Sequence, residues 1–197
     1  MRIHLPNSAF IGNIDPFLKA IETSNPDTLT VTSNKDWISV HPVVLSMVAS
    51  LGLNLTASHI HFEDLQAASK HYLERMNLFK MLGVKSGIHI TKHEAAGRFV
   101  PLTQIRDGKE LTSFITEMIP LLHIDPKHVD PIKYIISELV RNVLEHAQSK
   151  NGAILCAQYY KKSNMIRIGI ADTGVGIKNT ISESYRVSDD KEALQLS

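Results

Sequence analysis

The stretch that decides the fold of the second half of this chain runs from Pro131 to Ala147 and reads PIKYIISELVRNVLEHA. Its apolar residues recur every three or four positions, which predicts an amphipathic helix with one face in a core. The predicted buried stripe consists of Ile132, Ile135, Ile136, Leu139, Val143 and Ala147. Asp-Pro pairs stand at 125–126 and 130–131. Because a proline in the first turn loses only an amide that has no intrahelical partner, they indicate a helix start near Pro131.

A polar face runs beside this stripe and carries Glu138, Asn142 and Glu145. A glutamate and an asparagine one helical turn apart project in the same direction. The asparagine carbonyl oxygen suits Mg²⁺, which takes phosphate oxygens as further ligands. The glutamate beside it can orient or deprotonate a nucleophile near that phosphate.

A second polar motif follows about thirty residues later. Residues 152–160 and 166–171 are predicted strands joined by the polar turn KKSN, and the sequence Asp172-Thr-Gly174-Val-Gly176-Ile177 comes directly after them. Glycine lets the backbone approach a ligand closely, and a carboxylate accepts a hydrogen bond from an amino group. Together the two motifs indicate a site for the base and phosphates of one nucleotide.

Both motifs resemble those of a known family. The sequence ELVRNVLEHA (138–147) resembles the N box of the GHKL ATPase and kinase superfamily, which includes histidine kinases, anti-sigma serine kinases, the gyrase ATPase and mismatch-repair ATPases. The sequence DTGVG (172–176) resembles its first glycine box. The resemblance covers roughly residues 98–181 and is closest to the anti-sigma-kinase-like and unclassified bacterial members. It implies the Bergerat fold, a mixed sheet under a layer of helices.

The resemblance implies ATP and Mg²⁺ as ligands and gives roles to particular residues. Asn142 would bind Mg²⁺, and Glu138 would be catalytic by polarising the attacking water or hydroxyl. Asp172 would accept a hydrogen bond from the adenine amino group. The other pocket residues implied are His146, Thr173, Gly174, Gly176 and Ile177.

A second glycine box, which binds the phosphates in this family, does not follow Gly176 in this sequence. We expect either that the chain is a fragment of a longer protein, or that the phosphate half of the site is absent or supplied by a partner. The full-length form would be a protein kinase of the anti-sigma serine kinase type or an ATPase, and this chain alone would show little or no turnover. The alternative is a catalytically inactive docking or regulatory protein with a degenerate nucleotide site.

The first ninety residues have the pattern of a small α/β unit. The predicted elements are a strand at 28–33, a short buried helix at 43–51, a strand at 59–62 and a helix at 65–82 that ends at Gly83. The sequences WISVHPVVLSMVASLG and HYLERMNLFKMLG loosely resemble STAS-like modules, which implies a regulatory module that binds a protein partner.

The domain boundary is placed within residues 84–97, which are polar and glycine-containing. The expected organisation is therefore a STAS-like α/β module at 1–90 and a histidine kinase-like ATP-binding domain at 98–197, an α/β (α+β) fold class. Within the second domain, residues 98–105 are predicted to form an edge strand because of Pro101, and residues 111–122 a helix. An exposed sheet edge would allow a homo-oligomer.

The composition excludes several classes of protein. The chain has 197 residues, of which 43% are hydrophobic and 21% charged, with 21 basic and 20 acidic side chains. This balance gives no polycationic surface for a nucleic acid. A single cysteine favours the reducing cytoplasm. The start, MRIHLPNSAFIGN, has no apolar core of signal-peptide length, and the longest apolar stretch, residues 42–55, is too short to span a bilayer.

Some residues allow other interpretations. IADTG resembles the active-site loop of retroviral-type aspartic proteases, but that reading needs an all-β chain and leaves the N box unexplained. Metal-ligating patterns are weak, and their residues are interpreted as structural: His123, Asp125, His128, Asp130, His59, His61, His89 and His93. Cys156 is predicted to be a small buried hydrophobe, and Trp37 a packing residue.

Overall fold

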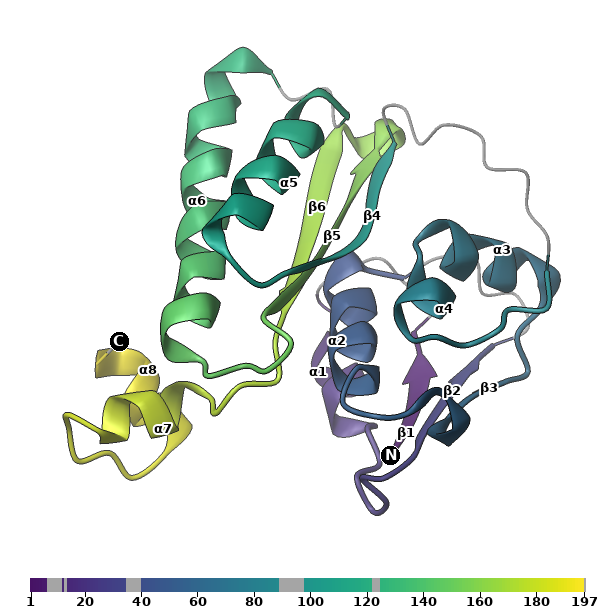
Figure 1. The fold of residues 1–197 in the computed structure, drawn as a ribbon, viewed down its shortest axis with the longest axis horizontal. Coiled ribbons are helices and arrows are strands. Elements are labelled where there is room, and N and C mark those ends of the chain that lie inside the picture. The colour runs from purple at the N-terminus through teal and green to yellow at the C-terminus, as the bar shows by residue number, and fades with distance from the viewer. Residues whose placement is uncertain (7–11, 13, 35–39, 89–97, 122–124, 197) are drawn as a thin grey trace.

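The structure is a computed structural model that describes residues 1–6, 12, 14–34, 40–88, 98–121 and 125–196 (Figure 1). These residues form a mixed α/β fold with two small sheets, as predicted. The strands are β1 (Arg2–Leu5), β2 (Leu29–Ser33), β3 (Ile60–Glu63), β4 (Phe99–Ile105), β5 (Ala153–Tyr160) and β6 (Met165–Ala171). The helices are α1 (Ile14–Lys19), α2 (Pro42–Gly52), α3 (Ala67–Arg75), α4 (Leu78–Met81), α5 (Gly108–Leu121), α6 (Pro126–His146), α7 (Ile177–Ser182) and α8 (Asp190–Leu196).

The first sheet is parallel and has the order β1-β2-β3. The predicted strands at 28–33 and 59–62 are β2 and β3, and the predicted helix at 43–51 is α2. Side chains alternate along a strand, so one face of the sheet packs into the core. The buried side chains on these strands include Ile3, Leu5, Leu29 and Val31. Strand β1 and helix α1 were not predicted, since four and six residues carry too little periodicity to be recognised.

The prediction of one helix at 65–82 is wrong, because two helices, α3 and α4, occupy this stretch. Helix α3 ends at Arg75 and α4 begins at Leu78. Asn77 lies between them in the left-handed conformation, with φ of 62°. A single left-handed residue breaks a helix, and asparagine tolerates that conformation well. The apolar spacing continues across the break because Leu73, Met76 and Phe79 all pack into the same core.

The second sheet has the order β4-β5-β6, and every strand pair in its described part is antiparallel. The family resemblance implied a mixed sheet, so the described strands correct that expectation. Strand β4 lies at an edge, as predicted from Pro101, and the register shifts between Val100 and Thr103 around that proline. A proline cannot donate a ladder hydrogen bond, so an edge with an irregular register accommodates it.

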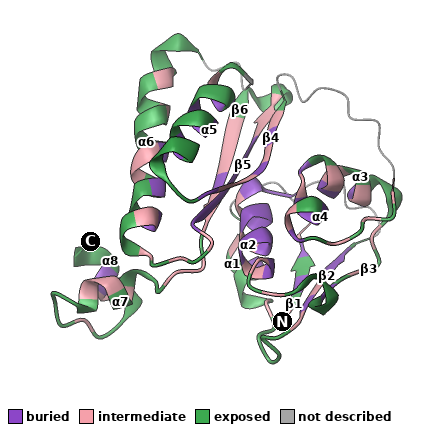
Figure 2. Ribbon diagram, viewed as in Figure 1, coloured by how far each residue is buried: buried purple, intermediate pink, exposed green. Residues whose placement is uncertain are grey.

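Helix α2 is shared by both halves of the chain. The two faces of the second sheet are covered by different elements, because α5 and α6 pack on Leu155 and Ala157 while α2 packs on Ile154 and Cys156. Figure 2 shows that α2 is buried along most of its length. One apolar cluster therefore contains residues from both predicted domains. Residues 89–97 of the predicted boundary lie outside the described part of the chain.

Helix α6 begins at Pro126, five residues earlier than predicted. Asp125 is its N-cap, because the Lys127 amide donates to Asp125 Oδ1 over 3.1 Å. Asp130 is not a cap but an exposed partner of Lys133 at 3.8 Å. The first Asp-Pro pair already supplies the cap, and Pro131 falls on the exposed side of the helix. There, solvent can bond the carbonyl that the proline leaves without an amide partner.

The buried stripe of α6 is narrower than predicted. Ile136 and Val143 are buried, together with Val140. Ile135 and Leu139, which were expected in the core, are 55% and 49% exposed. The described part of the second sheet has the three strands β4-β5-β6, and no further described strand is present to cover these two residues. Residues 177–196, for which no element was predicted, contain the short helices α7 and α8.

Candidate functional site

The predicted catalytic and magnesium-binding residues lie on one polar side of α6. Glu138, Asn142 and His146 are spaced by four residues and so follow each other along the helix. The Glu138 carboxylate pairs with the Arg141 guanidinium at 3.2 Å, and Arg141 also reaches Glu145 at 3.8 Å. The Asn142 side chain is exposed and has no hydrogen-bond partner within the described ranges. Its amide oxygen is therefore open to a ligand, whereas the Glu138 carboxylate already has a cationic partner.

The predicted adenine-binding sequence forms a tight turn after β6. The Gly174 amide donates to Asp172 Oδ1 over 2.7 Å, so one carboxylate oxygen closes the turn. The other oxygen, Oδ2, has no partner among the residues that the structure describes and can accept a hydrogen bond. Gly176 has φ of +80°, a conformation that favours glycine, and it precedes the first residue of α7, Ile177.

This turn is seated on the carboxyl end of α6. The Val175 amide donates to the Ala147 carbonyl over 2.8 Å, and Thr180 Oγ1 donates to the His146 carbonyl over 3.3 Å. A Cβ atom at Gly174 would overlap the Ala147 carbonyl oxygen, so this position requires glycine. The two motifs, about thirty residues apart in the chain, therefore meet where α6 ends.

The distances along α6 separate the predicted site residues into two groups. His146 lies beside the turn that holds Asp172, Thr173, Gly174, Gly176 and Ile177. At a rise of about 1.5 Å per residue, Asn142 lies about 7.5 Å along the helix from Ala147, and Glu138 about 6 Å further. A ligand that touched both Asp172 and Asn142 would have to be elongated, as a nucleoside triphosphate is.

Two residues near the turn were missed by sequence reasoning. Asn54, just after α2, donates through Nδ2 to Thr173 Oγ1 over 3.1 Å, and its Oδ1 accepts from Asn151 Nδ2 over 3.0 Å. No local sequence signal links Asn54 to a turn that lies 119 residues away. Only the packing of α2 on β5 and β6 brings them together.

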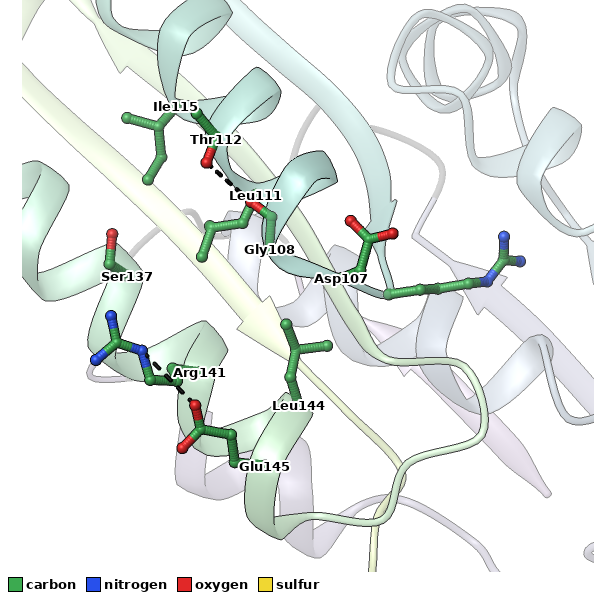
Figure 3. A pocket seen from close by; sticks show the side chains of 10 residues that line it. Asp107, Gly108, Leu111, Thr112, Ile115, Ser137, Arg141, Leu144 and Glu145 are labelled. Atoms are coloured by element: carbon green, nitrogen blue, oxygen red, sulfur yellow. Dashed lines mark hydrogen bonds and ion pairs between the residues drawn. The ribbon is translucent and has the colours of Figure 1, made fainter.

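A cavity of about 410 Å³ lies elsewhere, between α5 and α6 (Figure 3). Its lining residues are Arg106, Asp107, Gly108, Leu111, Thr112, Ile115, Ser137, Arg141, Leu144 and Glu145. None of the site residues predicted from the sequence contributes to it. Successive helical residues point about 100° apart, so Arg141 faces this cavity while Asn142 points to another side of α6.

The other sequence interpretations can now be compared with the structure. The mixed α/β fold excludes the all-β chain that an aspartic protease of the retroviral type requires. Over the described residues, no group of three or more His, Cys, Asp or Glu side chains is placed to hold a metal ion. Cys156 is fully buried, and burial raises the pKa of its thiol to about 12. Trp37, His89, His93 and His123 lie outside the described residues.

Comparisons with family models, with curated proteins and with solved structures find no match for this chain. None of the helices in the described part of the chain has both the length and the apolar character needed to cross a membrane.

Proposed function

We propose that this chain binds Mg-ATP between the Asp172–Gly176 turn and the polar side of α6. The observation that carries the proposal is the seating of the turn on the end of α6, through the Val175 amide and the Ala147 carbonyl at 2.8 Å. This contact brings the acceptor for a base amino group to the same helix as an unpaired carboxamide. The two motifs were identified in the sequence without knowledge of this contact, so the contact is independent support for their forming one site.

The donor groups suit the two ends of a nucleotide. Asp172 is exposed and its Oδ2 can accept from the adenine amino group, and Gly176, where an added Cβ would have no neighbour within 4 Å, offers open backbone to the ring. The Asn142 amide oxygen is a hard neutral ligand of the kind that Mg²⁺ takes beside phosphate oxygens and waters. When bound, Mg²⁺ would neutralise charge on the phosphates. His146, Thr173 and Ile177 would contact the nucleoside.

Glu138 is the proposed catalytic residue for phosphoryl transfer to a protein hydroxyl or to water, as in a signalling kinase or an ATPase. A carboxylate orients such a hydroxyl by accepting its proton in a hydrogen bond. The Arg141 guanidinium, 3.2 Å from Glu138 Oε1, competes with the hydroxyl for that carboxylate. The half-exposed pair is weak, of order 1 kcal/mol or less, so a nucleophile can displace it.

The proposal is tested by thermal unfolding with increasing Mg-ATP. A ligand that binds only the folded state stabilises it by about 2.7 kcal/mol at a concentration about one hundred times its dissociation constant. Asp172→Asn and Asn142→Ala should each abolish the rise in melting temperature while the variants still fold. Asp130→Asn, an exposed charge change on the same helix, is the matched control and should keep it.

The opposite result has a definite meaning. If Mg-ATP fails to stabilise the parent chain, or both site variants respond as the parent does, the nucleotide site is wrong. A protein-docking role with a degenerate nucleotide site would then be the better account. Addition of EDTA to the parent tests the role of Mg²⁺: it should weaken ATP binding if Asn142 acts through the metal ion, and unchanged ATP binding would contradict that role.

A further inference from the structure

Asn54 uses almost all of its hydrogen-bonding capacity to join the two halves of the chain. Its Nδ2 donates to the Ser50 carbonyl over 3.3 Å and to Thr173 Oγ1 over 3.1 Å. Its Oδ1 accepts from Asn151 Nδ2 over 3.0 Å. An asparagine amide offers two donors and one acceptor oxygen, so both donors are used. The contact to Ser50 fixes Asn54 to α2, and the other two contacts reach the second half of the chain.

Helix α2, which ends two residues before Asn54, packs closely against β5 and β6. Ser46 Oγ donates to the Gly169 carbonyl over 3.1 Å, and the Cys156 thiol donates to the Pro42 carbonyl over 3.3 Å. A Cβ atom at Gly169 would overlap the Pro42 backbone, so the helix and the strand are in close contact. The end of α2 therefore has a defined position relative to β6, the strand that leads directly into Asp172.

Thr173 is the residue between the proposed adenine acceptor and the first glycine of the turn. Its hydroxyl is held by Asn54 from one side, while the backbone of the turn is held by Ala147 from the other. Two independent anchors thus fix a short segment whose glycines would otherwise leave it conformationally free. Asp172 is part of the same segment, because its Oδ1 accepts from the Gly174 amide over 2.7 Å.

We infer that Asn54 is a positioning residue that holds the Asp172–Gly176 turn in its ligand-binding form and couples α2, and through it the parallel sheet, to the nucleotide site. The inference rests on the proposed function for its effect on ATP, but the anchoring contact can be tested without any nucleotide. A protein partner that shifted the end of α2 would change ATP affinity. By thermodynamic linkage, ATP would change the affinity for that partner by the same factor.

The first experiment is a double-mutant cycle on stability in the absence of nucleotide. Asn54→Ala and Thr173→Val each remove one side of the contact, and the double variant removes both. The expected result is non-additive: the denaturation midpoint of the double variant lies above the value that the two single losses predict. Additive losses would show that the two side chains do not interact, which would overturn the inference.

The second experiment measures nucleotide affinity and selectivity. Asn54→Ala should weaken ATP binding about tenfold, equivalent to about 1.4 kcal/mol. It should also lower the preference for ATP over GTP, because Asp172 would no longer be aimed at the adenine amino group. A purely structural loss would not change that preference. Asn54→Asp should restore both values, since its carboxylate can accept from the Thr173 hydroxyl and from the Asn151 amide.

Asn34→Ala is the matched control, because Asn34 also bonds through its side chain within the first half, to His4 at 3.2 Å. It should leave ATP affinity and selectivity unchanged. If the parent binds ATP and Asn54→Ala binds it with the same affinity and selectivity, the positioning role is wrong while the proposed function stands. If the parent does not bind ATP, the proposed function and the effect of Asn54 on ATP binding are both wrong. The double-mutant cycle on stability then still tests whether Asn54 holds Thr173.

Discussion

Helix α2 offers two serines whose replacement by alanine should change stability in opposite directions. Ser46 and Ser50 lie one turn apart and are 0% and 1% exposed. Ser46 Oγ has the Gly169 carbonyl at 3.1 Å and the Cys156 sulfur at 3.4 Å as partners. Ser50 Oγ is buried without a hydrogen-bond partner in the described part of the chain. The same chemical change therefore removes a satisfied hydroxyl in one case and an unsatisfied one in the other.

The magnitudes follow from these partners. Loss of the Ser46 hydroxyl removes a buried hydrogen bond and should cost about 1–2 kcal/mol. Loss of the Ser50 hydroxyl removes a buried unpaired polar group and should gain about 1 kcal/mol. Alanine is favoured over serine within a helix by about 0.5 kcal/mol in both cases, so this term cancels from the comparison. The two variants should differ by about 2–3 kcal/mol, or by about 4–12 °C in melting temperature for a chain of this size.

The assay is denaturant unfolding of the parent, Ser46→Ala and Ser50→Ala, followed by circular dichroism. Ser113→Ala, on the exposed side of α5, is the control for helix propensity; it also removes an exposed hydrogen bond to Glu117 at 3.2 Å, which water can replace. Ser50→Ala should raise the midpoint above that of Ser113→Ala, and Ser46→Ala should lower it below the parent. A loss of equal size for the two α2 variants would refute the reasoning, because it would mean that Ser50 Oγ has a partner.

Three further predictions concern the chemistry and backbone of the core. Burial raises the pKa of the Cys156 thiol to about 12. At a pH of about 8, this thiol should therefore react with a thiol reagent only at the rate of global unfolding, and it should react at once in urea. Burial lowers the pKa of His41, whose Nδ1 accepts a hydrogen bond from the Val43 amide at the start of α2. As the pH falls, His41 is therefore protonated at a higher pH in the unfolded chain than in the folded one. The unfolding free energy should therefore fall as the pH drops below about 6.5, and His41→Asn should flatten that slope. Gly152→Ala should lower the free energy of unfolding by more than about 1 kcal/mol, because φ is +66° and the added Cβ would overlap the last carbonyl of β4. Gly108→Ala, where the added Cβ has open space, should lower it far less in the same denaturation assay.

Local signals in the sequence were sufficient for elements whose boundaries are set by nearby residues. The hairpin of β5 and β6 was predicted from two apolar runs and the KKSN turn, and Asn164 in that turn adopts φ of 46°. Helix α2 was predicted because Pro42 and Gly52 bound a short apolar run. The break at Asn77 was not predictable from spacing, since the apolar pattern is the same on both sides of it.

Tertiary packing decided what spacing alone could not. The apolar stripe of α6 was predicted as one broad face, but which residues are buried depends on where the sheet ends, and Ile135 and Leu139 remain exposed. The contact of α2 with the second sheet was also missed. The four-residue spacing of Ser46 and Ser50 is the signal in the sequence for a second face on that helix, one with small polar side chains.

The candidate site was predicted as two motifs, and their nucleotide ligand stays a prediction. What the sequence could not contain is the contact between the turn and the Ala147 carbonyl, since a backbone acceptor carries no residue-type signal. Gly174 carries part of that information, because the close approach of the two segments excludes any Cβ at this position. A glycine in a turn has several explanations, so it could not identify the helix end as its neighbour.

The most direct test of the nucleotide site is a map of backbone amide chemical shifts by NMR while Mg-ATP is added to the ¹⁵N-labelled chain. The account predicts saturable changes confined to residues 138–147 of α6 and its end and to residues 172–177 of the turn. Changes confined to the α5–α6 cavity of Figure 3, or no saturable change anywhere, would contradict it.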